Sequence, residues 1–315
     1  MKKIRLIEVK SELGAGTRGA SLGPDAMRIA ALNSSSTFYS SYESKEVPNE
    51  NELLWSMNPT PNAKYIGGIR TMYERISASI SEELNAGTFP FVIAGDHSSA
   101  GGTIAGIKAA YPNKRLGVVW VDAHADLHTP FTTPSGNVHG MPLAVSLGED
   151  NLDCAMNPVS VEEKEHWDAM KNTGGGSPKI EAQDLVFIGV RDTEEPENYL
   201  LSKREIKNFT VAESRELGME TMAEKALGML SDCDMIYVSF DVDSLDSSIS
   251  MGTGTPVKNG FTVSEMDVIL STLVASPKLV CFEVVEVNPT LDNQCNRMAE
   301  EALKLSERVI RIIEK

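Results

Sequence analysis

The feature that most limits what this chain can fold into is a regular alternation of short apolar runs with longer amphipathic stretches. Several runs are β-branched and apolar at every position, which is typical of strands that helices cover on both faces. This alternation predicts a doubly wound α/β fold around a mostly parallel sheet. The predicted strands are Ile4–Val9, Phe89–Ala94, Leu116–Val121, Leu185–Val190, Met235–Phe240 and Leu279–Val285. The predicted helices are about Asp25–Ala31, Ile69–Asn85, Ala100–Ala110, Met219–Leu230, Val263–Val274 and Cys295–Ile313.

One segment interrupts this alternation. Residues 148–179 are polar and end in Gly174-Gly-Gly-Ser-Pro178, a composition typical of a surface loop or an insertion. The apolar runs before and after the segment look like strands of one sheet, so we expect residues 1–315 to form a single domain. A division into two domains at this segment is the alternative.

Composition and charge exclude several classes of protein. A formal net charge of −16 argues against a nucleic-acid partner and against binding to an anionic membrane surface. No apolar run approaches the ~20 residues of a transmembrane helix, and the N-terminus lacks the apolar stretch of a signal peptide. The four cysteines form no C-x-x-C pair and are expected to be buried free thiols, as in a reducing compartment. We therefore expect a cytoplasmic protein.

Polar residues follow directly after four of the predicted strands. In open α/β sheets, ligands bind beyond the carboxyl ends of the strands, so these residues are candidates for a functional site. They are Asp96-His97, Asp122-Ala-His124-Ala-Asp126, Asp241-Val-Asp243 and Glu286-Val-Asn-Pro289.

The spacing of these residues favours a metal centre. In extended backbone, residues i, i+2 and i+4 point to one face, so Asp122, His124 and Asp126 are expected to project together, as are Asp241 and Asp243. Such carboxylates can bridge two metal ions ~3.5–4 Å apart, and carboxylate-rich sites with some imidazole suit manganese. Several unpaired carboxylates beneath one apolar sheet would repel one another unless cations neutralised them.

The histidines support this interpretation, because most of them lie in or just after these strand ends. His166 is the exception: it lies in the polar segment and is expected to be solvated. A single aspartate after a strand is usually a turn residue or a helix cap. For Asp246 this structural role remains an alternative to a role in the site. The histidines near the strand ends are His97, His124, His128 and His139.

Ordered motifs along the chain resemble those of the arginase (ureohydrolase) family. The match runs from about residue 14 to residue 289, nearly the whole chain, and the order of the motifs makes it specific. The motifs are Gly19-Ala-Ser-Leu-Gly-Pro24 with Arg28, Gly95-Asp-His-Ser98, Asp122–Asp126, Ser135-Gly-Asn-Val-His139-Gly-Met-Pro142, Ser239-Phe-Asp-Val-Asp243, Gly252-Thr-Gly-Thr-Pro256 and Glu286–Pro289.

The resemblance implies a three-layer α/β/α fold, related to that of the deacetylases, and a binuclear site with two Mn2+ per subunit. It also implies a homo-oligomer, either a homotrimer or a homohexamer. Carried over by motif, the ligands of one metal are His97, Asp122, Asp126 and Asp241. The ligands of the other are Asp122, His124, Asp241 and Asp243, so that Asp122 and Asp241 bridge the two metals.

The reaction implied by the resemblance is hydrolysis of L-arginine, a small cationic guanidino substrate, to L-ornithine and urea. We hypothesise that a metal-bridging hydroxide attacks the guanidinium carbon, because two divalent cations lower the pKa of bound water. Glu286 would pair with the guanidinium, and Asp126 would orient the hydroxide and pass its proton to the leaving amine. His139 would exchange protons with bulk water, with a structural role in its loop as the alternative.

The resemblance also implies how the amino acid end of the substrate is bound. Ser135 and Asn137 would contact the α-carboxylate, Glu194 would bind the α-amino group, and Thr255 matches a threonine of the substrate pocket. His128 departs from the pattern, because arginases usually have an asparagine there that binds the α-carboxylate. Histidine can still donate a hydrogen bond, but this change leaves the substrate preference open.

Other functions remain as alternatives. Within the same reaction class these are a guanidino-acid hydrolase, an agmatinase and a formimidoylglutamase. A zinc amidohydrolase of the deacetylase architecture would be expected to have a single-metal site, whereas the motifs here supply ligands for two. A non-catalytic binding relative would be expected to have lost ligands, and none is missing from the sequence.

Overall fold

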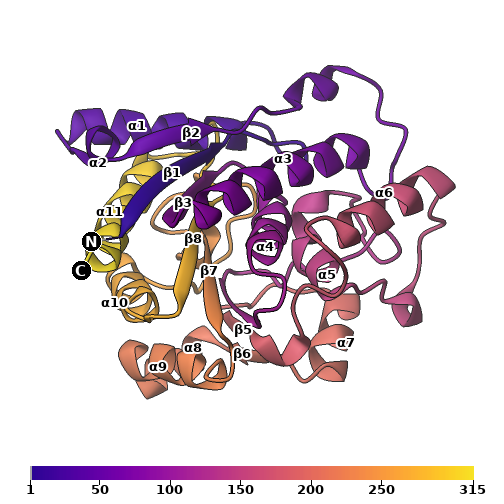
Figure 1. Cartoon of the computed structure of the whole chain (residues 1–315). Helices are drawn as coiled ribbons and strands as arrows, with labels where there is room; N and C mark the ends of the chain where they lie inside the picture. Colours follow the sequence, from indigo (N-terminus) through magenta and orange to yellow (C-terminus); the bar gives the residue numbers. More distant parts are fainter. Residues whose placement is uncertain (1) are drawn as a thin grey trace.

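The computed structural model describes residues 2–315 and contains one sheet with helices on both faces (Figure 1). All eight strands run parallel, in the order β2-β1-β3-β8-β7-β4-β5-β6. The strands are β1 (Lys3–Val9), β2 (Glu43–Glu46), β3 (Thr88–Ala94), β4 (Leu116–Val121), β5 (Leu185–Ile188), β6 (Lys207–Phe209), β7 (Met235–Asp241) and β8 (Leu279–Val285).

The helices connect these strands in chain order. The α-helices are α1 (Gly23–Asn33), α2 (Phe38–Ser41), α3 (Ile66–Asn85), α4 (Ser99–Ala110), α5 (Pro142–Leu147), α6 (Val161–Asn172), α7 (Glu195–Lys203), α8 (Val211–Leu217), α9 (Met219–Met229), α10 (Val263–Val274) and α11 (Arg297–Ile313). Short 3-10 helices are η1 (Ala20–Leu22), η2 (Asn51–Trp55), η3 (Val138–Gly140), η4 (Leu152–Cys154), η5 (Ala182–Asp184) and η6 (Val242–Ser244).

Two hydrophobic cores lie on the two faces of the sheet. Alternate residues of β4 enter different cores, with Val119 and Val121 in one and Val118 and Trp120 in the other. Helices α1, α9, α10 and α11 close the first core, and α3, α4, α5 and α6 close the second (Figure 1). The predicted three-layer α/β/α fold is therefore confirmed.

All the predicted strands and helices form, and their ends differ from the prediction by at most three residues. The sequence analysis missed β2 and β6, which are the two edge strands. β2 reads Glu-Ser-Lys-Glu and is largely exposed, so it has no apolar run to detect. Charged residues of this kind are typical of edge strands, where they discourage pairing with another chain.

The polar segment 148–179 contains helix α6. Ser160 caps this helix, because its side chain accepts a hydrogen bond from the Glu163 N–H while the Glu163 carboxylate accepts one from the Ser160 N–H. Trp167 and Met170 of α6 are buried in the second core. The expectation that His166 is solvated was wrong, because this side chain is half-buried beside Gly67.

The cysteines are free thiols, as predicted, but they are not all buried. Cys233 and Cys281 are buried, Cys154 is partly exposed and Cys295 is exposed. Within residues 2–315, no helix combines the length and the apolar character needed to cross a membrane.

The centre of the sheet brings the candidate site residues together. Strands β3, β8, β7, β4 and β5 are neighbours in that order, and all point the same way. The segments that leave their carboxyl ends therefore meet at one edge of the sheet, although they are separated by up to about 190 residues in the sequence.

Candidate metal centre and active site

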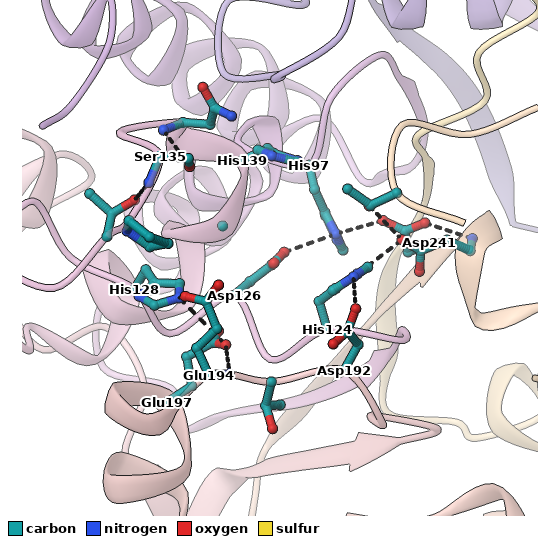
Figure 2. A pocket seen from close by; sticks show the side chains of 17 residues that line it. His97, His124, Asp126, His128, Ser135, His139, Asp192, Glu194, Glu197 and Asp241 are labelled. Atoms are coloured by element: carbon teal, nitrogen blue, oxygen red, sulfur yellow. Dashed lines mark hydrogen bonds and ion pairs between the residues drawn. The ribbon is translucent and has the colours of Figure 1, made fainter. Parts of the chain in front are cut away.

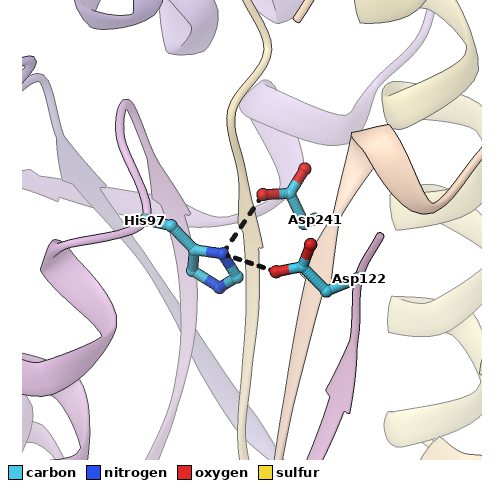
Figure 3. Close-up of side chains that lie close together, drawn as sticks. All are labelled: His97, Asp122 and Asp241. Atoms are coloured by element: carbon cyan, nitrogen blue, oxygen red, sulfur yellow. Dashed lines mark ion pairs between the residues drawn. The ribbon is translucent and has the colours of Figure 1, made fainter. Parts of the chain in front are cut away.

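Three carboxylates surround one nitrogen atom of His97. Its Nδ1 atom lies 3.0 Å from Asp122 Oδ2, 3.1 Å from Asp126 Oδ2 and 3.1 Å from Asp241 Oδ2. The four side chains are buried and come from the ends of β3, β4 and β7. His97, Asp122 and Asp241 place their ligand atoms close enough together to hold one metal ion (Figure 3).

A second group of ligand atoms surrounds His124. Its Nδ1 atom lies 3.0 Å from Asp243 Oδ2 and 3.5 Å from Asp122 Oδ1. Asp122 therefore faces His97 with one oxygen and His124 with the other. Asp122, His124 and Asp243 form this second candidate metal group. Asp241, also expected to bridge, turns Oδ2 toward His97 and accepts the Asp243 N–H at Oδ1, at 2.8 Å.

The donor atoms of both groups fit divalent cations. His97 Nδ1 and Asp126 Oδ2 are buried and make no hydrogen bond. Buried polar atoms without a partner are costly, and crowded carboxylates repel one another, so cations between them would relieve both penalties. Carboxylate oxygens with a few imidazole nitrogens are ligands that suit Mn2+ better than thiolate-binding metals. The residues present therefore fit a pair of such ions.

Burial and mutual repulsion shift the titration of these carboxylates. Burial and the charge of Asp122 raise the pKa of Asp126 to about 7. Burial, with the charges of Asp243 and Asp122, raises the pKa of Asp241 well above its ordinary value. Burial lowers the pKa of His124, but the charge of Asp243 and contacts with Asp122 outweigh this effect and raise the pKa overall. Burial also raises the pKa of Asp122, but His124 and His97 outweigh this effect and lower it, so positive charge close to these buried carboxylates favours their ionised form.

Two strand residues hold His97 from behind. Its ring stacks on Trp120 with centroids 4.1 Å apart, and its Nε2 atom lies 2.8 Å from Ser239 Oγ. A proton on Nε2, donated to Ser239, leaves the Nδ1 lone pair free for a metal. Trp120 Nε1 also donates to Asp122 Oδ2 at 2.9 Å. The sequence analysis gave neither residue a role, although each lies two positions before a candidate ligand on the same face of its strand (Asp122 and Asp241).

Glu286 connects His97 with His139. Its Oε1 atom accepts a hydrogen bond from the backbone N–H of His97 at 2.8 Å and lies 3.4 Å from His139 Nδ1. Burial lowers the pKa of His139, but its contact with Glu286 outweighs this effect and raises the pKa. Glu286 and Asp126 both have left-handed backbone conformations, with φ of 66° and 51°. Such strain in residues other than glycine is concentrated at functional sites.

A pocket of about 310 Å³ opens over both metal groups (Figure 2). Asp122 and Glu286 are buried and do not contribute to its wall. Asp192, Thr193 and Glu197 line it and were missed by the sequence analysis. The predicted site residues that line it are His97, His124, Asp126, His128, Ser135, Asn137, His139, Glu194, Asp241, Asp243 and Thr255.

The outer part of the pocket pairs His128 with two glutamates (Figure 2). His128 Nε2 lies 2.8 Å from Glu194 Oε2 and 3.6 Å from Glu197 Oε2. Its Nδ1 atom lies 3.3 Å from Thr132 Oγ1. Glu194 and Glu197 form a capping box at the start of α7. This E-x-x-E spacing at the start of a helix is the sequence pattern from which Glu197 could have been identified.

The loop of Ser135 and Asn137 also lines the pocket. Ser135 Oγ accepts the Asn137 N–H at 3.2 Å, so its own hydroxyl proton is free to be donated to a ligand. Thr255 lines the pocket and donates from Oγ1 to Asp243 Oδ2 at 3.2 Å, so it also supports the second metal group. Asp246 is a turn residue, because its carboxylate accepts the Ser248 and Gly260 N–H groups.

Comparison with known proteins gives consistent matches over the whole chain. Residues 2–311 match a family model described as the Arginase family. The arginase of Bacillus caldovelox is 36% identical over 309 residues, which cover 97% of each chain. The native structure of Bacillus caldovelox arginase superposes with a TM-score of 0.84 at 35% identity, over 98% of both chains. A structure of Entamoeba histolytica arginase in complex with L-ornithine has a TM-score of 0.84 at 26% identity, over 98% of this chain and 99% of that one.

Proposed function

The chain belongs to the arginase family, and we propose that it hydrolyses the guanidinium group of L-arginine to L-ornithine and urea. The family expected from the sequence motifs is thereby confirmed. The observation that carries the proposed reaction is the pair of candidate metal groups that share the buried Asp122 and whose other members line one pocket. L-Ornithine, the amino acid bound to the Entamoeba histolytica relative, is the product that this reaction would release.

We propose that the site holds two Mn2+ per subunit. His97, Asp122, Asp126 and Asp241 would be the ligands of one ion, and Asp122, His124, Asp241 and Asp243 those of the other. The close approach of Asp122, Asp126 and Asp241 to the unpartnered His97 Nδ1 supports the first set. When bound, two divalent cations supply hydroxide as a nucleophile near neutral pH.

Three side chains would act on the substrate. Glu286 is buried next to His139 of the pocket wall and would bind the guanidinium through charge-assisted hydrogen bonds, with its Oε1 atom held in position by the backbone N–H of His97. Asp126 turns Oδ2 toward His97 Nδ1 in the first metal group, so the other oxygen of its carboxylate would accept the proton of the nucleophile and deliver it to the leaving amine. His139, which lines the pocket beside Glu286, exchanges protons with the solvent.

The outer pocket would bind the amino acid end of the substrate. Ser135, Asn137 and His128 donate hydrogen bonds to the α-carboxylate, and Glu194 accepts from the α-amino group. Thr255 borders the side chain of the substrate. The position of all five residues in the wall of one pocket supports these roles.

We further propose that residues 1–315 form a single domain and that the protein is a cytoplasmic homotrimer or homohexamer. The direct pairing of β4 with β5, which lie on either side of segment 148–179, supports the single domain. The assembly follows from the family resemblance, and the location from the cysteine pattern of the sequence.

The test is turnover of a panel of substrates by protein reconstituted with Mn2+. Urea release is measured from L-arginine, agmatine, 4-guanidinobutyrate and 3-guanidinopropionate, and formamide release from formimidoylglutamate. The proposal predicts the highest kcat/KM for L-arginine. A preference for agmatine would show that the α-carboxylate contacts are misassigned, and no turnover of any compound would refute the enzymatic function.

A further inference from the structure

The outer pocket has an excess of negative charge. Asp192, Glu194 and Glu197 line its outer part, and none of the described residues that line it is a lysine or an arginine. A substrate with an α-carboxylate brings another negative charge, which these acids repel. A site selective for such a substrate therefore needs a source of positive charge close to the loop of Ser135 and Asn137.

Lys64, just before α3, lies against this loop. Its Nζ atom donates to Asn137 Oδ1 at 3.0 Å, and its backbone N–H donates to the Gly136 carbonyl oxygen at 2.8 Å. Gly136 has a φ of 74°, and a Cβ atom there would come within 1.9 Å of the Pro61 carbonyl oxygen. Only glycine fits this close approach, so the loop and the segment before α3 are packed together without intervening side chains.

The ammonium group of Lys64 determines which way the Asn137 amide points. An ammonium has only donors, so the amide atom that faces it must be the oxygen. The Nδ2 atom then lies on the other branch, close to Gly16, where a Cβ atom would come within 2.5 Å of it. Asn137 lines the pocket, and with Oδ1 bound to Lys64 its remaining polar atom is the N–H donor Nδ2, the type of group that a carboxylate ligand requires.

We propose that Lys64 is a specificity-determining residue that favours guanidino substrates with an α-carboxylate over those without one. It acts through Asn137, by holding the amide donor in place and by adding positive charge behind the loop. This inference rests on the proposed hydrolysis of a guanidino substrate and concerns the binding step. Lys64 is a positioning residue, because its ammonium contacts Asn137 and none of the groups assigned to the chemical step.

The test compares Lys64→Met with Lys64→Arg in the Mn2+-loaded protein. For Lys64→Met, KM for L-arginine should rise by about tenfold, the loss of one charge-assisted contact, while kcat changes by less than about twofold. KM for agmatine, which lacks the carboxylate, should stay within about twofold of the wild type. Lys64→Arg, which keeps a cationic donor, should recover most of the affinity for L-arginine.

Lys45→Met is the matched control, because it removes the same charge from an exposed lysine that pairs with Glu82 on α3. It should leave both KM values unchanged. Calorimetry of L-ornithine and 1,4-diaminobutane tests binding independently of turnover, and only L-ornithine should bind more weakly to Lys64→Met.

The role of Lys64 would be overturned if the variant changed KM equally for L-arginine and agmatine, or affinity equally for L-ornithine and 1,4-diaminobutane, or changed none of them. The melting temperature shows whether the variant is folded. If Lys64→Met does not fold, the same comparison is made with Lys64→Arg and with Asn137→Asp, which should selectively weaken L-ornithine. The absence of urea release from wild-type protein would instead refute the proposed function, and the calorimetry would still decide the role of Lys64.

Discussion

His128 Nε2 lies 2.8 Å from Glu194 Oε2, so the side chain proposed to bind the α-carboxylate and the one proposed to bind the α-amino group face each other at hydrogen-bond distance. Their contact uses one donor of His128 and one acceptor of Glu194. An amino acid substrate has to replace this contact with two of its own, one from its α-carboxylate to His128 and one from its α-amino group to Glu194. The histidine at position 128 therefore couples the two halves of the outer pocket.

Replacement of His128 by asparagine tests this coupling. The shorter amide keeps a donor for the carboxylate but loses the contact with Glu194. The free energy of substrate binding therefore no longer includes the cost of breaking that contact, about 1 kcal/mol. We expect kcat/KM for L-arginine to rise about fivefold. His166→Asn, outside the pocket, should have no effect. A fall of tenfold or more in His128→Asn would show that the imidazole itself is the better carboxylate ligand.

Asp126→Asn tests the proton transfer assigned to the Asp126 carboxylate. An amide cannot accept and deliver the proton, so kcat should fall by about 10²–10⁴-fold. The melting temperature and the Mn2+ content of the variant show whether the fold and the metals are retained. Asp246→Asn is the control, because this carboxylate belongs to a turn. Retention of kcat in Asp126→Asn would remove that residue from the mechanism.

Ser239→Ala tests whether the hydrogen bond behind His97 matters for metal binding. Without the contact of 2.8 Å between Oγ and Nε2, the ring loses the partner that fixes its tautomer. Loss of such a partner typically weakens metal affinity by about 10–100-fold. Titration of chelator-treated protein with Mn2+ measures this change. Ser271→Ala, which removes a hydroxyl without a hydrogen bond, should bind Mn2+ like the wild type; equal affinities of the two variants would contradict the prediction.

Lys179 predicts a pH dependence of stability away from the metal site. Burial lowers its pKa from 10.5 to about 8. Between these values the unfolded chain holds a proton that the folded chain has released, so the free energy of unfolding should rise with pH, by about 3 kcal/mol in total. Chemical denaturation across this range should show the rise in the wild type and in the exposed-lysine control Lys164→Met. Lys179→Met should lack it, and the same slope in all three proteins would contradict this account.

The sequence predicted the central strands and the candidate metal residues for one physical reason. β4 is buried on both faces and reads as an uninterrupted apolar run, so the polar residues at its end stand out. Asp122, His124 and Asp126 follow each other at every second position. The edge strand β2 lacks such a run and was missed.

The supporting residues were harder to predict. Trp120 and Ser239 lie inside buried strands, where a sequence pattern cannot distinguish a core residue from one that holds a ligand. Lys64 and Asn137 are 73 positions apart, and only the packing of the segment before α3 against the pocket loop brings them together. Contacts of this kind depend on the tertiary arrangement, so no pattern in the local sequence reveals them.

The central claim is that two cations are held by carboxylates and imidazoles that meet at the ends of β3, β4 and β7. The most direct measurement is the metal content per subunit, determined by elemental mass spectrometry on protein that has been reconstituted with Mn2+ and freed of excess metal. The account predicts two ions in the wild type and fewer in Asp122→Ala, which removes the carboxylate shared by both groups. A wild-type content of one ion or none, or an unchanged content in Asp122→Ala, would contradict it.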